Sequence, residues 1–230
     1  MRLAVTRPQA DGERTATALR ARGHQVLVAP LMKVEPVAAD LAGGWAGVVI
    51  TSANAPGAIA IHPALLTLPA YAVGRRSAEA ARQAGFSEVT TAGGDVRDLV
   101  RLIAERDADA KGPLLYPAGE DRAADLIGEL SARGIAAEMR VVYRAITAPY
   151  PPALIAALKA GEIDAVLHFS KRSADNYIAG AGPAGIAELA LAVRHFCLSP
   201  QIAEPLTKAG AAHVAVAARP DEAALIDLVS

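Results

Sequence analysis

Short polar segments that could bind an anionic molecule follow six of the predicted strands and stand directly before predicted helices. Backbone N–H groups at the beginning of a helix bind carboxylates or phosphates, and nearby cations strengthen such sites. Serine and asparagine are also ordinary helix caps, so each residue alone has a purely structural explanation. Arginine or lysine recurs at these positions in both halves of the chain, which favours a bound anion. The candidate binding residues are Arg7, Ser52, Asn54, Gly74, Arg75, Ser77, Gly119, Arg122, Ser170, Lys171, Arg172, Ser199 and Gln201.

Most familiar catalytic and cofactor sites are excluded by the sequence. Neither G-x-G-x-x-G after a strand nor G-x-x-x-x-G-K-[ST] occurs, so no motif supports a dinucleotide or nucleoside triphosphate site. Cys197 is the single cysteine, which excludes disulfides and cysteine-based metal sites, and its apolar neighbours predict a buried side chain. No Ser–His–Asp arrangement can be assembled. The five histidines lack metal-ligand spacing and are expected on the surface or at strand ends: His24, His62, His168, His195 and His213.

The elements that must position these segments are short aliphatic strands that alternate with amphipathic helices. This order predicts βαβ units with parallel sheets. Strands are predicted near residues 3–5, 26–29, 48–51, 71–73, 89–91, 114–116, 165–169, 196–198 and 214–216. Helices are predicted near 11–22, 54–61, 95–106, 120–133 and 172–178, with others that end near 84, 161 and 209 and a last one from 221.

Three sequence blocks recur in the same order, which indicates that the chain consists of two copies of one α/β half. Residues 3–23 align with 114–134, 46–52 with 164–170, and 72–85 with 197–210. Any two βα units look alike over one block, but three ordered blocks favour duplication.

Two long extended stretches, 25–37 and 136–148, lie between the copies, and each is about twice the usual strand length. They are predicted to connect two domains. The default ligand site of such a protein is a cleft between the two halves, faced by the carboxyl ends of the strands.

The composition describes a globular chain with an aliphatic core and almost no net charge. The 230 residues include 23 Lys+Arg and 24 Asp+Glu, a formal net charge of −1, with 53% hydrophobic and 4% aromatic residues. Near-zero charge argues against a nucleic-acid binder that relies on bulk electrostatics. No stretch approaches the roughly 20 apolar residues of a membrane span, and the first eight residues lack a signal peptide's apolar region. We therefore expect a cytoplasmic protein that binds neither nucleic acid nor membrane.

Six short segments form an ordered set of motifs along the chain: Val5-Thr6-Arg7-Pro8, Ile50-Thr51-Ser52-Ala53-Asn54-Ala55, Tyr71-Ala72-Val73-Gly74, Leu115-Tyr116-Pro117-Ala118-Gly119, Val141-Val142-Tyr143-Arg144 and Ala165-Val166-Leu167-His168-Phe169-Ser170. Each motif is degenerate, but their combination is specific and spans essentially the whole chain. In these ordered motifs the chain resembles the uroporphyrinogen-III synthase family.

The resemblance implies an α/β fold of two similar domains, each a parallel sheet flanked by helices, joined by a two-stranded β-ladder with a cleft between them. Carried over to this chain, residues 1–34 plus 148–230 form the first domain and 38–142 the second, with linkers at about 35–37 and 143–147. It also implies a lyase that cyclises linear hydroxymethylbilane to uroporphyrinogen III, with loss of water and inversion of ring D. This small-molecule substrate carries eight carboxylates, no cofactor or metal is expected, and we expect a monomer.

Tyr143 matches the tyrosine of the family's Val-Tyr motif and is expected to be the general acid that helps hydroxide leave. On physical grounds alone, a strand tyrosine packed across the ladder is an equally good interpretation. The chain departs from the family's pattern where Ser77 stands for threonine and where Ser199 or Gln201 replaces a missing threonine. The segment 170–173 replaces Ser-Pro-Ser and adds two cations, which are expected to contact substrate carboxylates.

Two other functions remain as alternatives. A non-catalytic two-lobed binding module for a tetrapyrrole or another anionic metabolite would suit the same two halves, although we expect no room for an output domain. An α/β enzyme of another family that uses phosphorylated substrates is disfavoured by the missing phosphate loop.

Overall fold

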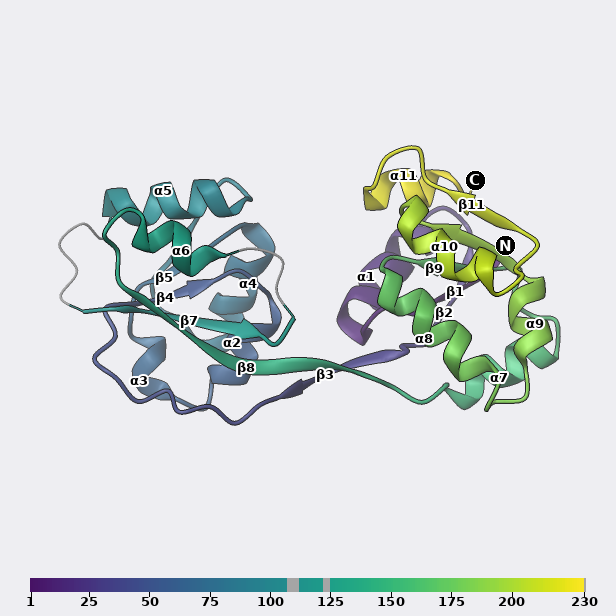
Figure 1. Cartoon of the computed structure of the whole chain (residues 1–230), viewed down its shortest axis with the longest axis horizontal. Helices are drawn as coiled ribbons and strands as arrows, with labels where there is room; N and C mark the ends of the chain where they lie inside the picture. Colours follow the sequence, from purple (N-terminus) through teal and green to yellow (C-terminus); the bar gives the residue numbers. More distant parts are fainter. Residues whose placement is uncertain (107–111, 122–124, 230) are drawn as a thin grey trace. The chain divides into compact units, whose positions relative to one another are not determined.

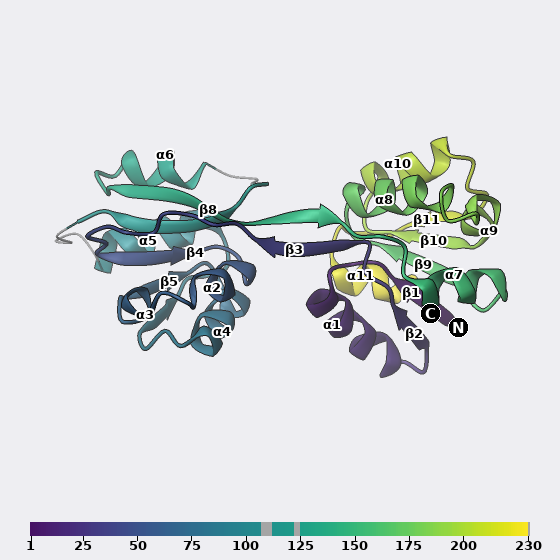
Figure 2. The ribbon, with the colours of Figure 1, turned by 90° about the horizontal axis from the view of Figure 1, so that it is seen from below.

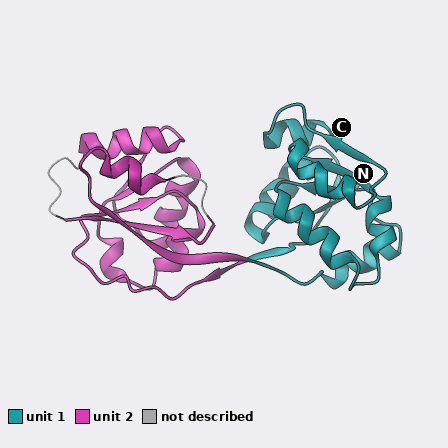
Figure 3. Ribbon diagram, viewed as in Figure 1, with its two compact units in different colours: residues 1–33, 146–230 teal, residues 34–145 magenta. Residues whose placement is uncertain are grey.

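A computed structural model describes residues 1–106, 112–121 and 125–229, and the chain divides into two compact units. Unit 1 comprises residues 1–33 and 146–230, and unit 2 comprises residues 34–145 (Figure 3). The chain therefore begins in unit 1, builds the whole of unit 2, and then returns to complete unit 1.

Unit 1 is a parallel sheet, five-stranded in its described part, with the order β11-β10-β9-β1-β2 (Figure 1). Leu154, Tyr177 and Leu206 belong to the core on one face, and Leu19 and Leu225 belong to the core on the other. The strands are β1 (Arg2–Val5), β2 (Gln25–Val28), β9 (Ala165–His168), β10 (Arg194–Cys197) and β11 (Val214–Val216). The helices are α1 (Gln9–Arg20), α7 (Pro152–Lys159), α8 (Lys171–Ala181), α9 (Ala187–Ala192), α10 (Pro200–Lys208) and α11 (Glu222–Asp227).

Unit 2 is built on the sheet order β3-β8-β7-β4-β5-β6, in which the strands from β8 to β6 are parallel. Trp45 and Ile50 belong to the core on one face, and Leu99 and Leu130 belong to the core on the other. The strands are β3 (Met32–Pro36), β4 (Gly47–Ile50), β5 (Ala70–Ala72), β6 (Val89–Thr91), β7 (Leu114–Gly119) and β8 (Ala137–Thr147). The helices are α2 (Asn54–Ile59), α3 (Pro63–Leu66), α4 (Arg75–Ala84), α5 (Val96–Arg106) and α6 (Leu126–Ser131).

The five strands of the unit 1 sheet correspond in order to five of the strands of the unit 2 sheet, so the predicted fold class of two similar parallel α/β halves is confirmed. The order β11-β10-β9-β1-β2 in unit 1 repeats as β6-β5-β4-β7-β8 in unit 2. The glycines that end equivalent helical segments share the left-handed backbone that glycine adopts most readily: Gly85 has φ 105° and Gly210 has φ 92°.

The predicted ladder consists of β3 and β8, which are neighbours in the sheet order (Figure 2). The pair is antiparallel, because Val37 N–H donates to the Val142 carbonyl (2.8 Å) and Ala148 N–H donates to the Leu31 carbonyl (3.0 Å). β8 is also hydrogen-bonded to β7 along much of its length, so this strand belongs to the unit 2 sheet as well as to the pair with β3.

The extended stretch 25–37 contains two strands, β2 at the predicted strand 26–29 and the later β3, separated around Pro30, which lacks an N–H group for a sheet. Within the predicted helix 120–133, the described residues form α6, whose N-cap Asp125 accepts a hydrogen bond from Gly128 N–H (3.0 Å). The short helices α3 and α9 are absent from the prediction because four to six residues show little helical periodicity.

Among the described helices, none is long and apolar enough to cross a bilayer.

Candidate active site

Four neighbouring strands of unit 2 bring candidate residues to one edge of its sheet. β7, β4 and β5 are parallel neighbours whose carboxyl ends meet there, and β8 runs parallel to β7 and continues past this edge. Tyr143 lies on β8 beside Gly119, the last residue of β7. Ser52 follows β4, and Gly74 follows β5. The sheet therefore gathers four predicted site residues that the sequence separates widely.

Gly119 makes room for the ring of Tyr143. The two residues are paired across a register irregularity after Ala118, and Glu120 N–H donates to the Tyr143 carbonyl (3.0 Å). A Cβ atom on residue 119 would lie 2.7 Å from the Tyr143 ring and 2.9 Å from its hydroxyl oxygen. The ring is half-buried and packs against the core that contains Val142. The Tyr143 hydroxyl is thereby fixed at the carboxyl end of β7.

Replacing Gly119 by alanine is expected to lower kcat at least about tenfold, because the added methyl group occupies the place of the Tyr143 ring and hydroxyl. Overpacking of this kind costs about 1–3 kcal/mol of stability. The matched control is Gly44→Ala, since a Cβ there meets nothing within 4 Å. Steady-state kinetics and thermal unfolding of both variants test this. An unchanged kcat in Gly119→Ala would contradict the link between the two residues.

The other predicted residues of unit 2 differ in how accessible they are. Ser52 accepts a hydrogen bond from Asn54 N–H (3.2 Å), so its hydroxyl partly serves the beginning of α2. Arg75 is exposed and lies 3.9 Å from Glu79. Ser77 is only 5% exposed in the first turn of α4, so its hydroxyl is almost entirely shielded from solvent. Arg122 lies outside the described residues.

Three neighbouring strands of unit 1, β10, β9 and β1, present the equivalent edge. Ser170 caps α8 and accepts a hydrogen bond from Ser173 N–H (3.1 Å). Ser199 precedes α10 in extended conformation and makes no side-chain cap, which leaves its hydroxyl available to a ligand. Gln201 is exposed in the first turn of α10. The two possible replacements for the missing threonine thus stand at the same helix beginning.

Arg7 follows β1, but its charge is shared with a carboxylate from the far end of the sequence. Its Nη1 donates to Glu222 Oε1 (3.0 Å) and to Thr15 Oγ1 (3.0 Å), and the guanidinium lies 4.2 Å from the Phe169 ring centroid. Partial burial acts to raise the pKa of Glu222, but the hydrogen bond from Thr15 and the Arg7 and Arg14 guanidinium groups outweigh it and lower that pKa. Arg7 is therefore held in place at the strand edge by a group that sequence patterns do not reveal.

The cations at the beginning of α8 are accessible. Lys171 Nζ lies 2.9 Å from Asp175 one turn along the helix, in an exposed ion pair that contributes little to stability. Arg172 is exposed beside it. A hollow of about 480 Å³ between α8 and α10 is lined by both ends of two ion pairs, Lys171–Asp175 and Lys208–Glu204.

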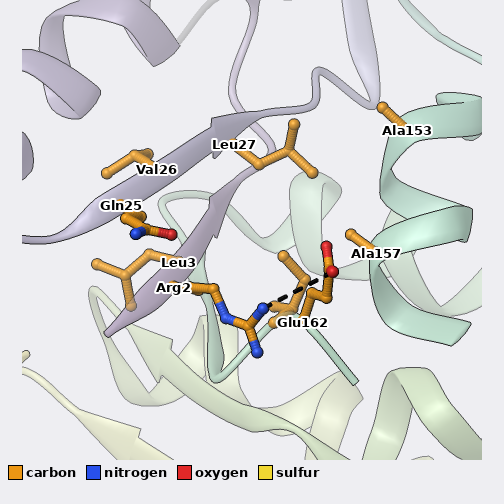
Figure 4. A pocket seen from close by; sticks show the side chains of 9 residues that line it. Arg2, Leu3, Gln25, Val26, Leu27, Ala153, Ala157 and Glu162 are labelled. Atoms are coloured by element: carbon orange, nitrogen blue, oxygen red, sulfur yellow. Dashed lines mark ion pairs between the residues drawn. The ribbon is translucent and has the colours of Figure 1, made fainter. Parts of the chain in front are cut away.

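Another hollow, of about 340 Å³, lies at the opposite end of the unit 1 sheet (Figure 4). It is lined mainly by aliphatic side chains of β1, β2 and α7, among them Leu3, Leu27 and Ala157. The ion pair between Arg2 and Glu162 (3.9 Å) lies in its wall. Because Arg2 begins β1, this hollow is separate from the carboxyl-end residues.

Two histidines form a buried pair that the sequence prediction missed. His168 ends β9, as expected for a strand-end residue, and His195 is the second residue of β10; both are fully buried, so neither takes the surface position that was the other expectation. His168 Nε2 and His195 Nδ1 lie 3.1 Å apart, and both rings pack edge-on against Tyr177. His168 Nδ1 and His195 Nε2 have no hydrogen-bond partner among the described residues.

Cys197 is buried in β10, as the sequence predicts, and burial raises the pKa of its thiol to about 12. In the described ranges, His, Cys, Asp and Glu side chains form no group of three that could hold a metal ion.

The fold defines a class: α/β proteins made of two similar parallel-sheet units and a pair of connecting strands. Residues 13–227 match the model of the family described as uroporphyrinogen-III synthase HemD. The chain belongs to the uroporphyrinogen-III synthase family. Its function is that of a cyclising lyase of heme and tetrapyrrole biosynthesis.

A solved structure shares this fold. Uroporphyrinogen-III synthetase from Helicobacter pylori 26695 matches with a TM-score of 0.64 and 17% identity, covering 100% of this chain and 98% of that chain. A mutant uroporphyrinogen III synthase from the extremely thermophilic bacterium Thermus thermophilus has a TM-score of 0.47 and 18% identity, over 100% of this chain and 97% of that chain. The search of curated proteins returned no match.

Proposed function

We propose that this protein converts linear hydroxymethylbilane to uroporphyrinogen III, with Tyr143 as the general acid. The observation that carries the proposal is the position of the Tyr143 hydroxyl over Gly119, at the carboxyl edge of the unit 2 sheet. Ser52 and Gly74 stand at helix beginnings on the same edge. A proton donor and anion-binding groups are thus available together for a substrate that carries carboxylates.

The proposed reaction begins when the C–O bond of the terminal hydroxymethyl group breaks. Tyr143 donates its phenolic proton, so the leaving group departs as water and an electrophilic azafulvene remains. Ring D attacks this centre through its substituted carbon, and the resulting spiro intermediate fragments and recloses with ring D inverted. The pyrrole proton lost on final ring closure balances the proton that Tyr143 supplied. Proton donation by one positioned group typically contributes about 10²–10⁴-fold.

Orientation is the larger part of the proposed catalysis. The linear substrate also cyclises unaided to the uninverted type I isomer, so the protein must hold ring D against the electrophilic end. Holding two reacting groups in alignment contributes up to roughly 7–11 kcal/mol. Arg7, Lys171, Arg172, Ser199 and Gln201 in unit 1 are proposed to hold substrate carboxylates for this purpose.

An enzymatic assay tests the proposal directly. The purified protein is coupled to enzymatic production of hydroxymethylbilane, and the oxidised porphyrins are separated into isomers. Type III porphyrin in excess over a protein-free control is the expected result. Type I product alone would overturn the proposal and leave a binding module for the same anionic molecule.

Replacing both Lys171 and Arg172 by alanine is expected to raise KM by about tenfold at low salt, since each exposed charge contact contributes up to about 1 kcal/mol. The effect should shrink as ionic strength rises. Stability should hardly change, because both side chains are exposed. The matched control is Lys159→Ala with Arg133→Ala, which removes one exposed lysine and one exposed arginine that do not line the hollow between α8 and α10. An unchanged KM would refute the placement of the substrate at α8.

The proposal also includes a monomeric, cytoplasmic protein that acts on a small molecule and binds no nucleic acid. The net charge of −1 supports the proposal that the protein binds no nucleic acid. The single buried cysteine supports a reducing compartment.

A further inference from the structure

Asn176, in the second turn of α8, contacts both segments through which the chain leaves and re-enters unit 1. Its Nδ2 donates to the Leu31 carbonyl (3.2 Å), directly before β3. Its Oδ1 accepts from the Thr147 hydroxyl (3.1 Å), at the end of β8. The amide N–H of the Asn176 side chain therefore binds one connecting segment, and its amide oxygen binds the other.

The neighbouring contacts make this a defined junction. Ala148 N–H donates to the same Leu31 carbonyl (3.0 Å), so the two segments are also paired with each other there. The Tyr150 hydroxyl donates to the Tyr177 carbonyl (2.7 Å). Gly180 leaves room for the Tyr150 ring, since a Cβ there would lie 2.6 Å from it. One face of α8 thus holds the re-entering segment at two places and the leaving segment through Asn176.

The same helix carries candidate substrate-binding residues at its beginning. Asn176 is five residues beyond Lys171, which corresponds to about 8 Å along a helix axis. α8 is anchored by buried Ala174 and Tyr177, both 0% exposed, so the beginning and the second turn belong to one rigid body. A group bound at Lys171 and the start of both connecting segments are therefore fixed relative to each other.

We propose that Asn176 is a positioning residue for the cyclisation: it holds the beginning of β3 and the end of β8 at fixed points on unit 1. This inference rests on the proposed function. Ring closure with inversion requires reacting groups held in alignment, and a displacement of about 1 Å can cost on the order of 10²-fold in rate. A residue with this role affects kcat and the isomer ratio more than KM.

Variants of the two polar contacts give a graded test. Asn176→Ala removes both hydrogen bonds, and Asn176→Asp removes only the donor to Leu31. Thr147→Val removes the hydroxyl, whereas Thr147→Ser keeps it and is the matched control. We expect kcat to fall about tenfold in Asn176→Ala, with KM changed less than about twofold and a larger share of type I product. The kcat values and type I shares of Asn176→Asp and Thr147→Val should lie between those of Asn176→Ala and the wild type. Thr147→Ser should match the wild type.

A distance measurement separates positioning from mere stabilisation. Cysteines introduced at Arg97 in unit 2 and Glu188 in unit 1, both exposed, carry spin labels, while buried Cys197 stays unlabelled. The distance distribution should broaden in Asn176→Ala and stay unchanged in Thr147→Ser. Identical distributions and isomer ratios in Asn176→Ala and wild type, with only a lower Tm, would overturn the inference. If the wild type formed no type III product, the proposed function would fail, but the distance distributions would still decide the role of Asn176.

Discussion

The Tyr143→Phe variant is expected to lower kcat by on the order of 10²–10⁴-fold while KM changes little. Phenylalanine keeps the ring that packs over Gly119, so the pairing of β7 and β8 is retained and only the proton donor is lost. Because the substrate also cyclises unaided, the released product should shift towards the type I isomer. Steady-state kinetics with isomer separation measure both quantities.

The matched control is Tyr71→Phe, which removes a phenolic hydroxyl from β5 in the core of the same unit. We expect kcat and the isomer ratio of this variant to stay close to wild type. If Tyr143→Phe behaved like Tyr71→Phe, Tyr143 would be a packing residue. The general acid would then be another group at the carboxyl edge of the unit 2 sheet.

Acidification from pH 7 to about pH 4 is expected to destabilise unit 1 more than unit 2. Burial and the neighbouring His195 ring lower the pKa of His168 well below its ordinary value. Burial lowers the pKa of His195 to about 4. A buried neutral histidine takes up a proton at a lower pH than the same residue in the unfolded chain. Its contribution to the free energy of unfolding is therefore complete above about pH 6.5 and is lost as the pH falls towards 4. For His195 alone this amounts to about 3 kcal/mol.

The duplication supplies an internal control for this effect. The positions equivalent to His168 and His195 in unit 2 are Ile50 and Ala70, both buried. Amide hydrogen exchange at several pH values should show protection of β9 and β10 falling with acid faster than protection of β4 and β5. The carboxyl of Glu222, also in unit 1, has a lowered pKa and contributes to the acid response. A variant is therefore needed to isolate the contribution of the two histidines.

That variant is His168→Ile with His195→Ala, which copies the unit 2 pair into unit 1. It is expected to be less stable at pH 7, since alanine leaves a small cavity, but its stability should decline less between pH 7 and pH 4. Chemical denaturation at each pH measures the slope of the free energy of unfolding against pH. A slope equal to that of the wild type would show that the histidine pair does not control the acid response.

The sequence predicts the architecture well because the architecture is periodic and repeated. Aliphatic runs alternate with helices closed by glycines such as Gly23 and Gly134, and the three aligned blocks coincide with equivalent strands in both sheets. Local patterns of this kind record which residues face a core, and that is sufficient to predict parallel sheets.

The site is predicted less completely because its contacts join distant parts of the chain. Arg7 and Glu222 are 215 residues apart, and Asn176 and Leu31 are 145 apart, so neither contact leaves a local signal. Gly119 is interpreted from the sequence as part of an anion-binding turn, whereas in the structure it gives space to the Tyr143 ring. Ser77 occupies a helix beginning, yet the packing of α4 turns it inwards.

The path of the chain through unit 1 also orders the events of its synthesis. Unit 2 is continuous, so all strands of its sheet are available once residue 147 has been made, and domains generally fold as units during synthesis. β1 and β2 emerge first, but two strands with one helix are not stable alone. β1 obtains its second neighbour only when β9 is made, at the register Leu3↔Ala165. The first strands made are therefore among the last to be completed, and unit 2 folds as an insertion within a unit that is still open.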